Sequence, residues 1–298
     1  MAGSKGAEWQ MNGDGFPPAL RAYLGALEAA TRSSIPEVVS LIAFGSAVVG
    51  GYEEGLSDVD LIIVVSDETD AEGLERVRAT VAGVEAEHGL GPSLRRSATE
   101  QLLDRLTANV RSFFVCTRTD LLSGDAARIL GLPRAQASFV DGVVLPSIFN
   151  AAATVSGEDL VHGVPLRPVT RGDILRAWFA LTGQALLCVL AYPFTRDATK
   201  FAMGVVKRSV HNCYCCYHGA PAQLSTEAAF FARRRPSLEP PLRRLLALRR
   251  DYLPSPRFVA GAAWILAQLH LVTALDNQFP RVLGRPPSRC PGRSDVLC

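Results

Sequence analysis

The chain has 298 residues, of which 48% are hydrophobic and 20% are charged. This composition excludes a globally disordered protein, and the length is sufficient for one or two domains with a sizeable core. The net charge of +2 conceals an asymmetry: residues 1–135 carry 12 basic against 19 acidic residues (net −7), and residues 136–298 carry 19 against 10 (net +9). The asymmetry indicates an acidic metal site and a basic phosphate site in different regions, or simply an unevenly charged surface.

The first half of the chain has the pattern of an α/β domain over residues 16–135, after a polar, Gly-rich segment (1–15) that we expect to be a flexible leader. Helical spacing of apolar residues begins at Pro17, and β-rich runs follow. We expect strands at 37–44, 58–65, 92–98 and 111–118, and helices at 17–32, 70–89 and 98–106.

The second half, residues 136–280, consists of long helical patterns separated by Pro and Gly, which predicts an all-helical domain. A loop at 161–173 leads into a helix near Asp173, and a helix at 199–219 ends at Gly219. A loop at 233–244 leads into a further helix, and the Pro/Arg-rich residues 281–298 are expected to form a mobile tail.

Cellular location is indicated by the cysteines and by two apolar runs. The number of cysteines is odd, seven, and no secretory signal opens the sequence, so we expect a cytoplasmic protein. Residues 177–194 and 258–275 are each 18 residues long and near the lower limit for crossing a bilayer. Both contain Gln, Gly, Thr or His, and we expect buried helices of a soluble bundle with no membrane association.

The segment GSAVVGGYEEGLSDVDLIIVV, residues 45–65, carries the strongest chemical signal. Asp58 and Asp60 are two residues apart on an expected strand, so both side chains point to the same face. Two neighbouring carboxylates repel each other unless a cation lies between them. Mg²⁺ prefers such oxygen ligands and takes its remaining ligands from substrate phosphates. The pair therefore predicts a magnesium site.

Gly45 and Ser46 follow the first strand, and we expect them to start a helix. The backbone N–H groups there and the Ser46 hydroxyl are suited to hold a phosphate. Three further glycines, at positions 50, 51 and 55, allow the connecting loop to turn tightly. The alternative is a Gly-rich turn before an acidic strand end on an ordinary α/β domain.

These residues resemble the motif of the nucleotidyltransferase superfamily that includes DNA polymerase beta. The motif is an apolar residue, Gly and Gly or Ser, a gap, and Asp-x-Asp on a strand. Here it reads Phe44, Gly45, Ser46, eleven residues, then Asp58-Val59-Asp60, with Ser57 before the pair and Leu61 after it. The resemblance covers residues 38–65. In layout the chain is most similar to small bacterial antibiotic nucleotidyltransferases, which carry a helical C-terminal domain.

The resemblance implies an α+β protein with a nucleotidyltransferase-fold N-terminal domain and an all-helical C-terminal domain. It implies Mg²⁺-dependent transfer of a nucleoside monophosphate from a nucleoside triphosphate, ATP being the expected one, to a hydroxyl group, with release of pyrophosphate. Gly45, Ser46 and Ser57 would contact the nucleotide. Asp58 and Asp60 would be catalytic and hold the metal.

One departure from the family concerns the third carboxylate, which family members place on a later strand. The expected strand at 92–98 offers Arg95 and Arg96 instead. Glu100 lies just beyond it and Asp120 follows the next β-rich run, and these are the two candidates. A two-metal reaction needs carboxylates that bridge both ions. Two alternatives follow: a catalytically weakened nucleotide-binding or regulatory protein, and a metabolite enzyme that reuses the fold for another reaction.

The helical half offers candidate partners for phosphate. Lys200 and Lys207 are seven apart, hence on one helical face, and Lys is a compact charge suited to a triphosphate. The segment TKFAMGVVK is also similar to the family segment that supplies a phosphate-binding lysine. The alternative is two surface lysines. Asp173, at the start of a helix, is either a general base for the acceptor hydroxyl or a helix N-cap.

The segment HNCYCCYHG, residues 211–219, suggests a metal site, because His211, Cys215 and His218 share one helical face. A straight helix spreads these three over about 10 Å, which is too far for one ion, and Cys is common in cores. Zinc and a plain core are the two interpretations.

The acceptor is predicted from charge. A region with a net charge of +9 attracts anions and repels cations. We therefore expect a neutral or anionic small molecule. RNA comes second because aromatic residues form only 7% of the chain and do not interleave with the basic clusters.

Overall fold

The computed structural model describes residues 17–50, 52, 59–90, 112–195 and 197–276. The chain divides into two compact units. Unit 1 comprises Met1–Leu94, Arg111–Leu132 and Ala152–Pro165, and unit 2 comprises Arg95–Val110, Pro133–Ala151 and Leu166–Cys298. The expected strand at 92–98, the expected helix at 98–106, the leader and the tail lie outside the described residues, apart from the ends that border them.

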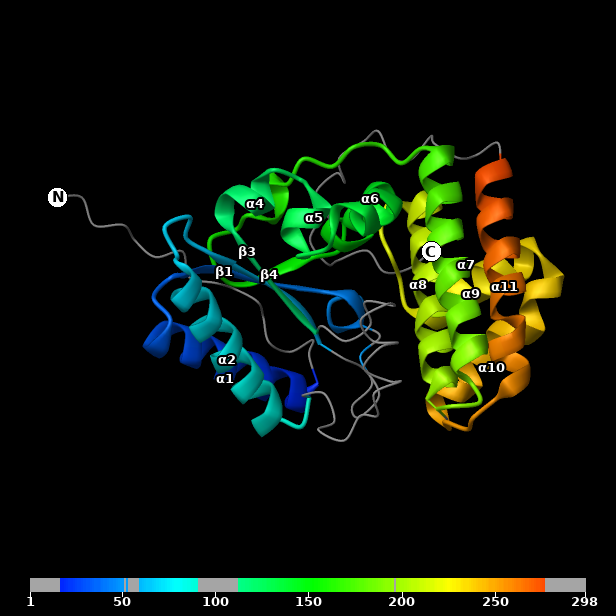
Figure 1. Cartoon of the computed structure of the whole chain (residues 1–298), viewed down its shortest axis with the longest axis horizontal. Coiled ribbons are helices and arrows are strands. Elements are labelled where there is room, and N and C mark those ends of the chain that lie inside the picture. Colours follow the sequence, from blue (N-terminus) through cyan, green and yellow to red (C-terminus); the bar gives the residue numbers. More distant parts are fainter. Residues whose placement is uncertain (1–16, 51, 53–58, 91–111, 196, 277–298) are drawn as a thin grey trace, which may run out of the picture. The chain divides into compact units, whose positions relative to one another are not determined.

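Unit 1 is built on a mixed sheet in the order β3-β2-β1-β4 (Figure 1). Its strands are β1 (Val38–Phe44), β2 (Asp60–Val65), β3 (Phe113–Thr117) and β4 (Ala153–Gly157). β1 is antiparallel to both β2 and β4, whereas β2 and β3 are parallel. The strands expected at 37–44, 58–65 and 111–118 are confirmed.

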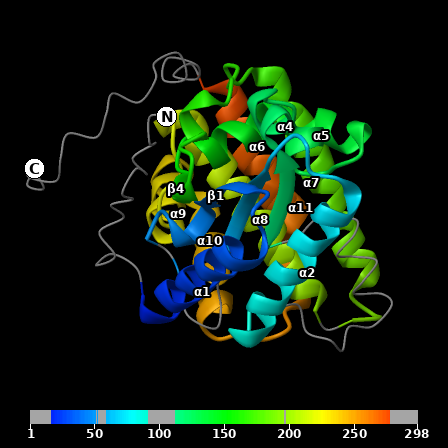
Figure 2. The ribbon, with the colours of Figure 1, turned by 90° about the vertical axis from the view of Figure 1, so that its left-hand side faces the viewer.

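One face of this sheet is covered by α1 (Pro18–Ser34) and α2 (Ala71–Glu87), which Figure 2 shows on the same side of the strands. Alternate residues of the strands pack against them, among them Leu41, Leu61 and Ile63. Both helices were expected. α2 begins where the Asp70 side chain accepts a hydrogen bond from the backbone N–H of Gly73, a regular N-cap.

The opposite face carries two short helices, α4 (Arg118–Leu122) and α5 (Ala126–Ile129) (Figures 1 and 2). Leu121 and Ile129 from these helices are fully buried, as are Ile62 and Val64, which alternate with the residues facing α1 and α2. Asp60 belongs to this second set of β2 residues, so its side chain lies on the face opposite α1 and α2.

β4 corrects the expected domain boundary near residue 135. Residues 153–157 were expected to belong to the all-helical half, yet β4 pairs with β1 from Ala43 opposite Ala153 to Ser40 opposite Gly157. The chain thus leaves the first unit after Leu132, makes one helix, and returns to complete the sheet.

Unit 2 is helical. It contains α6 (Arg134–Phe149), α7 (Arg171–Ala191), α8 (Ala198–His218), α9 (Leu224–Arg234), α10 (Glu239–Arg250) and α11 (Pro256–Leu275). α7, α8 and α11 pack side by side around a core that includes Leu181, Val205, Phe231 and Leu266. α8 ends at Gly219, whose φ of 76° confirms the expected C-terminal stop.

Two helices of unit 2, α7 and α11, are long and apolar enough to cross a membrane by length and composition. They correspond to the apolar runs 177–194 and 258–275. In the structure both contribute to the core of unit 2. About one third of the most apolar stretch of α7 is buried, and about half of that of α11.

Candidate functional site

The turn after β1 brings a backbone segment against a carboxylate. Phe44, the last residue of β1, is paired with Asp60, the first residue of β2. Gly45 follows with a φ of +70°, a conformation that favours glycine. A Cβ atom on Gly45 would lie 2.5 Å from Oδ2 of Asp60, well inside van der Waals contact. A side chain at this position would therefore displace the Asp60 carboxylate from its place against the turn.

Ser46 adds a second unusual group to the same turn. Its side chain is buried, and its Oγ has no hydrogen-bond partner among the described residues. Burying an unsatisfied hydroxyl costs about 1–3 kcal/mol, so such groups are rare and require a reason. The expected helix here is a single 3₁₀ turn, Gly45–Ala47, which corrects the prediction of a phosphate held by a helix N-terminus.

The chemistry of these groups fits a metal bound together with phosphate. A half-buried carboxylate, a turn without a side chain and an unpartnered hydroxyl offer hard oxygen ligands and room for an anion. Val59, which precedes Asp60, packs in the core with α1 and α2. Buried apolar and half-buried polar side chains therefore alternate between the two faces here, as expected for a strand. Asp58 and Ser57 lie outside the described residues.

The strand next to Asp60 carries an aromatic residue on the same face. In β3, Phe113 is paired with Leu61 and Phe114 with Ile62. The rings of Phe114 and Phe44 stack with centroids 6.3 Å apart. Among the described residues of β1, β3 and β4, no carboxylate lies beside Asp60. Sequence reasoning missed this aromatic pair, for which the adjacent Phe113 and Phe114 were the available signal.

Asp120 is wrong as a candidate third carboxylate. β2 and β3 run parallel, and Asp120 follows the end of β3, which pairs with the end of β2 at Val65. Asp60 opens β2, so the five intervening steps place the two carboxylates at opposite ends of the strands, about 17 Å apart along them. The other candidate, Glu100, lies outside the described residues.

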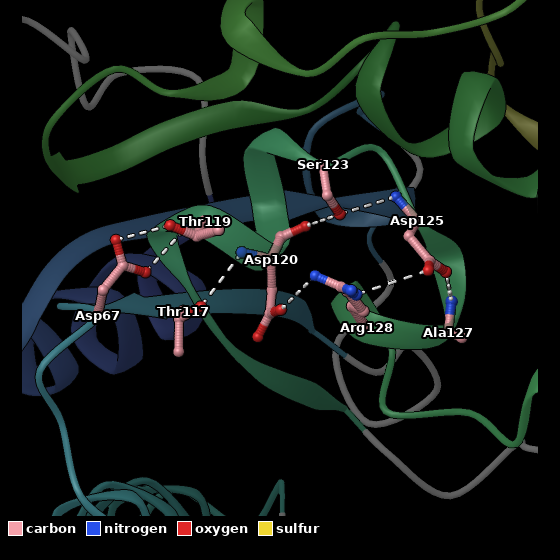
Figure 3. Close-up of polar contacts among 8 residues, drawn as sticks. All are labelled: Asp67, Thr117, Thr119, Asp120, Ser123, Asp125, Ala127 and Arg128. Carbon is pink, nitrogen blue, oxygen red and sulfur yellow. Dashed lines mark hydrogen bonds and ion pairs between the residues drawn. The ribbon is translucent and has the colours of Figure 1, made fainter.

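Asp120 instead belongs to a polar cluster that fixes α4 and α5 (Figure 3). Its backbone N–H donates to Oγ1 of Thr117, and its carboxylate lies 3.8 Å from Arg128. Asp67 accepts hydrogen bonds from the backbone N–H and the hydroxyl of Thr119, each 2.8 Å long, and these bonds lower the pKa of Asp67. The cluster is structural.

Glu158 and Asp159 lie at that same far end of the sheet. Both follow β4, whose last residue pairs with Ser40 near the start of β1. Glu158 forms an ion pair of 2.8 Å with Arg118, and Asp159 accepts a hydrogen bond from Thr154. Neither carboxylate is at the Gly45 end of β1.

In unit 2, Lys200 and Lys207 lie on one strip of α8. The less buried residues of this helix repeat at helical spacing: Lys200, Met203, Gly204, Lys207, Arg208, His211, Tyr214 and His218. The Lys200 ammonium group lies 3.2 Å from Asp197 and 5.0 Å from the centre of the Tyr252 ring. The expectation that both lysines share a face is thus confirmed.

Asp173 is neither a free base nor the N-cap residue. The N-cap of α7 is Thr170, and Asp173 completes a capping box with it. The buried carboxylate also pairs with Arg167 at 2.8 Å and Arg176 at 2.6 Å. Burial raises its pKa, but the hydrogen bonds from Arg167 and Thr170 and the charge of Arg167 outweigh burial and hold the pKa well below its usual range. A carboxylate so strongly stabilised in its ionised form is a poor general base.

Of the two interpretations of residues 211–219, the described residues do not favour zinc, because no group of three or more of their His, Cys, Asp or Glu side chains could hold a metal ion. Nδ1 of His211 lies 2.6 Å from the fully buried Glu227, and His218 stacks on Tyr214. Burial raises the pKa of Cys215 to about 12, as expected for a core thiol.

Comparison with known proteins gives one family match and one similar solved structure. Residues 26–105 match the family model described as "Nucleotidyltransferase domain". No curated protein matched the sequence. Among solved structures, the fold is similar to that of spectinomycin adenyltransferase AAD(9) from Enterococcus faecialis, determined with ATP and spectinomycin. The TM-score is 0.53 and the identity 12%, over 84% of this chain and 98% of that one. The family model thus matches residues 26–105, and the likeness to the solved structure shows a shared fold.

Proposed function

We propose that the protein transfers a nucleoside monophosphate, AMP in the first instance, from a nucleoside triphosphate to a hydroxyl group of a small molecule, with release of pyrophosphate. The observation that carries the proposal is the close approach of Gly45 to the Asp60 carboxylate, next to the unpartnered hydroxyl of Ser46. It lies within the segment that matches the nucleotidyltransferase family. The structural neighbour was determined with ATP, which supports the choice of nucleotide.

In this proposal each residue of unit 1 has one role. Asp60, together with Asp58, would hold Mg²⁺, which would offset negative charge on the triphosphate and on the transferred group. The turn at Gly45 accommodates phosphate oxygens, and the Ser46 hydroxyl donates a hydrogen bond to one of them. Because Asp173 is occupied by two arginines, we do not retain it as the general base.

The acceptor in this proposal is a neutral or anionic small molecule. A site for a polycation needs available carboxylates, but five of the acidic residues that the structure describes in unit 2 are engaged with basic side chains. Such pairs are Asp173 with Arg167 and Arg176, Asp197 with Lys200, Glu227 with His211, Glu239 with Arg243, and Asp276 with Arg234. The solved neighbour contains spectinomycin, which supports a small molecule over RNA and makes that antibiotic a necessary comparison in the assay.

The second candidate is a nucleotide-binding protein with weakened catalysis. No carboxylate lies beside Asp60 in the described strands, and residues 92–98, where the third carboxylate was expected, lie outside the described residues. With one carboxylate fewer, nucleotide binding would persist while transfer would be slow. Turnover distinguishes the two candidates, because both predict nucleotide binding.

The test measures pyrophosphate release with ATP, Mg²⁺ and parallel panels of spectinomycin and other aminoglycosides, neutral alcohols, acidic metabolites and RNA. We expect release with a neutral or acidic small molecule. Asp60→Asn should abolish it, by about a thousandfold if the electrostatic contribution is typical, whereas Asp120→Asn should leave it unchanged. Full activity in Asp60→Asn would disprove the assigned site. Modification of an aminoglycoside alone would disprove the acceptor class.

Thermal unfolding separates binding from turnover. Mg²⁺ and ATP together should raise the melting temperature of the protein more than either does alone, because the metal needs phosphate oxygens to complete its ligands. A joint shift without pyrophosphate release would support the weakened protein. The absence of any joint shift would contradict both candidates.

A further inference from the structure

α7 exposes a regular line of apolar side chains. Phe179, Leu186 and Leu190 are 65%, 52% and 69% exposed, and Gly183 lies between them on the same line. The steps from 179 to 183, 186 and 190 are four, three and four residues, which is the repeat of a coiled-coil seam. Helix faces with this repeat pack against another helix, so we call these four residues the α7 seam.

The α7 seam is distinct from the face that anchors the helix in unit 2. Leu181, Ala185 and Cys188 on the other side of α7 are buried in the core with α8 and α11. Figure 1 shows α7 and α11 running side by side. No charged residue occurs between Arg176 and residue 196. One face of α7 therefore packs in the core of unit 2, and the opposite, exposed face carries no charge.

We propose that a second copy of this chain covers the α7 seam, with the two α7 helices antiparallel about a twofold axis. The seam is self-complementary in this arrangement. An axis midway between Gly183 and Leu186 places Leu186 of each copy opposite Gly183 of the other, and Phe179 opposite Leu190. A twofold contact requires such pairing of large with small positions, because the same patch serves both copies.

Local geometry permits the close approach. A Cβ atom built on Gly183 would meet nothing within 4 Å, so space remains above this position for an incoming leucine. In the same register Arg176 of one copy lies opposite Pro193, just past the C-terminus of α7 in the other. Positive charge near a helix C-terminus is favourable, which adds charge complementarity to the fit.

The exposed area is also of the right order. Together with Val189 and Phe194, which are 38% and 75% exposed, the seam presents roughly 500 Å² of apolar surface. Pairing two copies removes about twice this area from water, and polar residues at the rim bring the total toward the range of stable dimers. The single-residue width of the seam favours a helix as its partner over a lipid surface, which imposes no spacing. This inference does not depend on the proposed function.

The first test measures the mass of the full-length protein in solution by sedimentation over a concentration series. We expect a dimer, and Leu190→Glu should raise the dissociation constant of the dimer at least tenfold. The matched control is Leu253→Glu, at a similarly exposed leucine outside α7, 61% against 69% exposed. The control should dimerise like the unmodified protein.

Gly183→Leu is a second variant, in which a loss of dimerisation could not be attributed to misfolding. Leucine favours helix more than glycine does and meets no neighbour in the single chain, so the melting temperature of the monomer should rise. In the dimer the new side chain clashes with Leu186 of the second copy. Stabilised folding with lost dimerisation is the expected combination.

Cysteine pairing tests the orientation, in a background with Cys290 and Cys298 replaced by serine. Mixed Phe179→Cys and Leu190→Cys proteins should crosslink under mild oxidation, whereas either variant alone should not, since positions 179 and 179 lie about 16 Å apart along antiparallel helices. Self-crosslinking of either variant would disprove the antiparallel register. A monomer at every concentration, an unchanged dimer in both Leu190→Glu and Gly183→Leu, or seam-dependent binding of the monomer to phospholipid vesicles would overturn the proposal.

Discussion

A Cβ atom on Gly45 would lie 2.5 Å from Oδ2 of Asp60. The two residues meet because β1 ends at Phe44, directly opposite the first residue of β2, and the chain then turns with φ of +70°. Two requirements therefore fall on Gly45: a left-handed backbone, and the absence of a side chain where the carboxylate lies. The two can be separated by experiment.

Gly45→Ala should abolish pyrophosphate release and lower the free energy of unfolding by about 1–3 kcal/mol, because the methyl group displaces the Asp60 carboxylate in addition to straining the backbone. Gly89→Ala is the matched control. Gly89 has a φ of +69°, and its Cβ would meet nothing within 4 Å. Gly89→Ala should lower the free energy of unfolding by about 1 kcal/mol and leave activity intact. Equal activity in the two variants would show that the contact with Asp60 is irrelevant to function.

Ser46→Ala should separate function from stability. The hydroxyl is buried without a partner, so its removal should leave the free energy of unfolding unchanged or raise it by up to about 1 kcal/mol. ATP affinity, measured by calorimetry with Mg²⁺, should fall about tenfold if the hydroxyl donates to a phosphate. Ser40→Ala, which removes a 2.7 Å hydrogen bond to the Glu158 carbonyl, should show the reverse: lower stability and unchanged affinity. Unchanged affinity in Ser46→Ala would remove Ser46 from the site.

The strands that carry the candidate site could be predicted because their signals are local. The β-rich runs, the alternation around Asp60 and the glycine after β1 are all readable within some thirty residues, residues 37–65. The faces assigned to Asp60 and to the two lysines of α8 followed from helix and strand periodicity alone.

Pairing between distant segments could not be predicted. β4 is only five residues long, ATVSG, which is too short for a clear β signal of its own, and its partner β1 lies more than a hundred residues earlier in the sequence. Asp120 failed as a candidate for a related reason. Its distance from Asp60 depends on whether β3 runs parallel or antiparallel to β2. The sequence of a short strand does not indicate which of the two directions it takes.

The residue that caps the start of α7 was predicted only to within one helical turn. Asp173 was expected either as a base or as an N-cap, but Thr170 caps the helix, and Arg167 from the preceding loop completes the pairing. Similarly, His211 was considered with its neighbours on α8, whereas its partner Glu227 comes from α9. Side-chain partners from other elements depend on packing.

Asp173→Asn should destabilise the protein by about 2–3 kcal/mol, since it weakens the capping box and leaves Arg167 and Arg176 without their carboxylate. Its native pKa is lowered, so the stabilisation is present above the ordinary pKa of 3.8 and is lost as pH falls below it. The variant should therefore lose less stability than the native protein in acid. The specific activity of folded variant should remain. A folded but inactive Asp173→Asn protein would restore the general-base hypothesis.

His270 should make unit 2 sensitive to mild acid. The imidazole is buried between α7 and α8: Nδ1 lies 3.2 Å from the carbonyl of Ile174, and Nε2 lies 2.8 Å from the hydroxyl of Ser209. A carbonyl only accepts, so Nδ1 carries the proton and Nε2 accepts from Ser209. Protonation of Nε2 would place a positive charge in a buried site, and this burial lowers the pKa of His270 to about 4.

The sign of the effect follows from proton binding. Between pH 6.5 and pH 4 the unfolded chain protonates this histidine and the folded protein does not, so the free energy of unfolding falls as pH decreases through this range, by up to about 3 kcal/mol. His270→Gln should lower stability at pH 7 but flatten the pH dependence in this window. Chemical denaturation at a series of pH values measures both, and parallel curves for native protein and His270→Gln would show that His270 titrates normally in the fold.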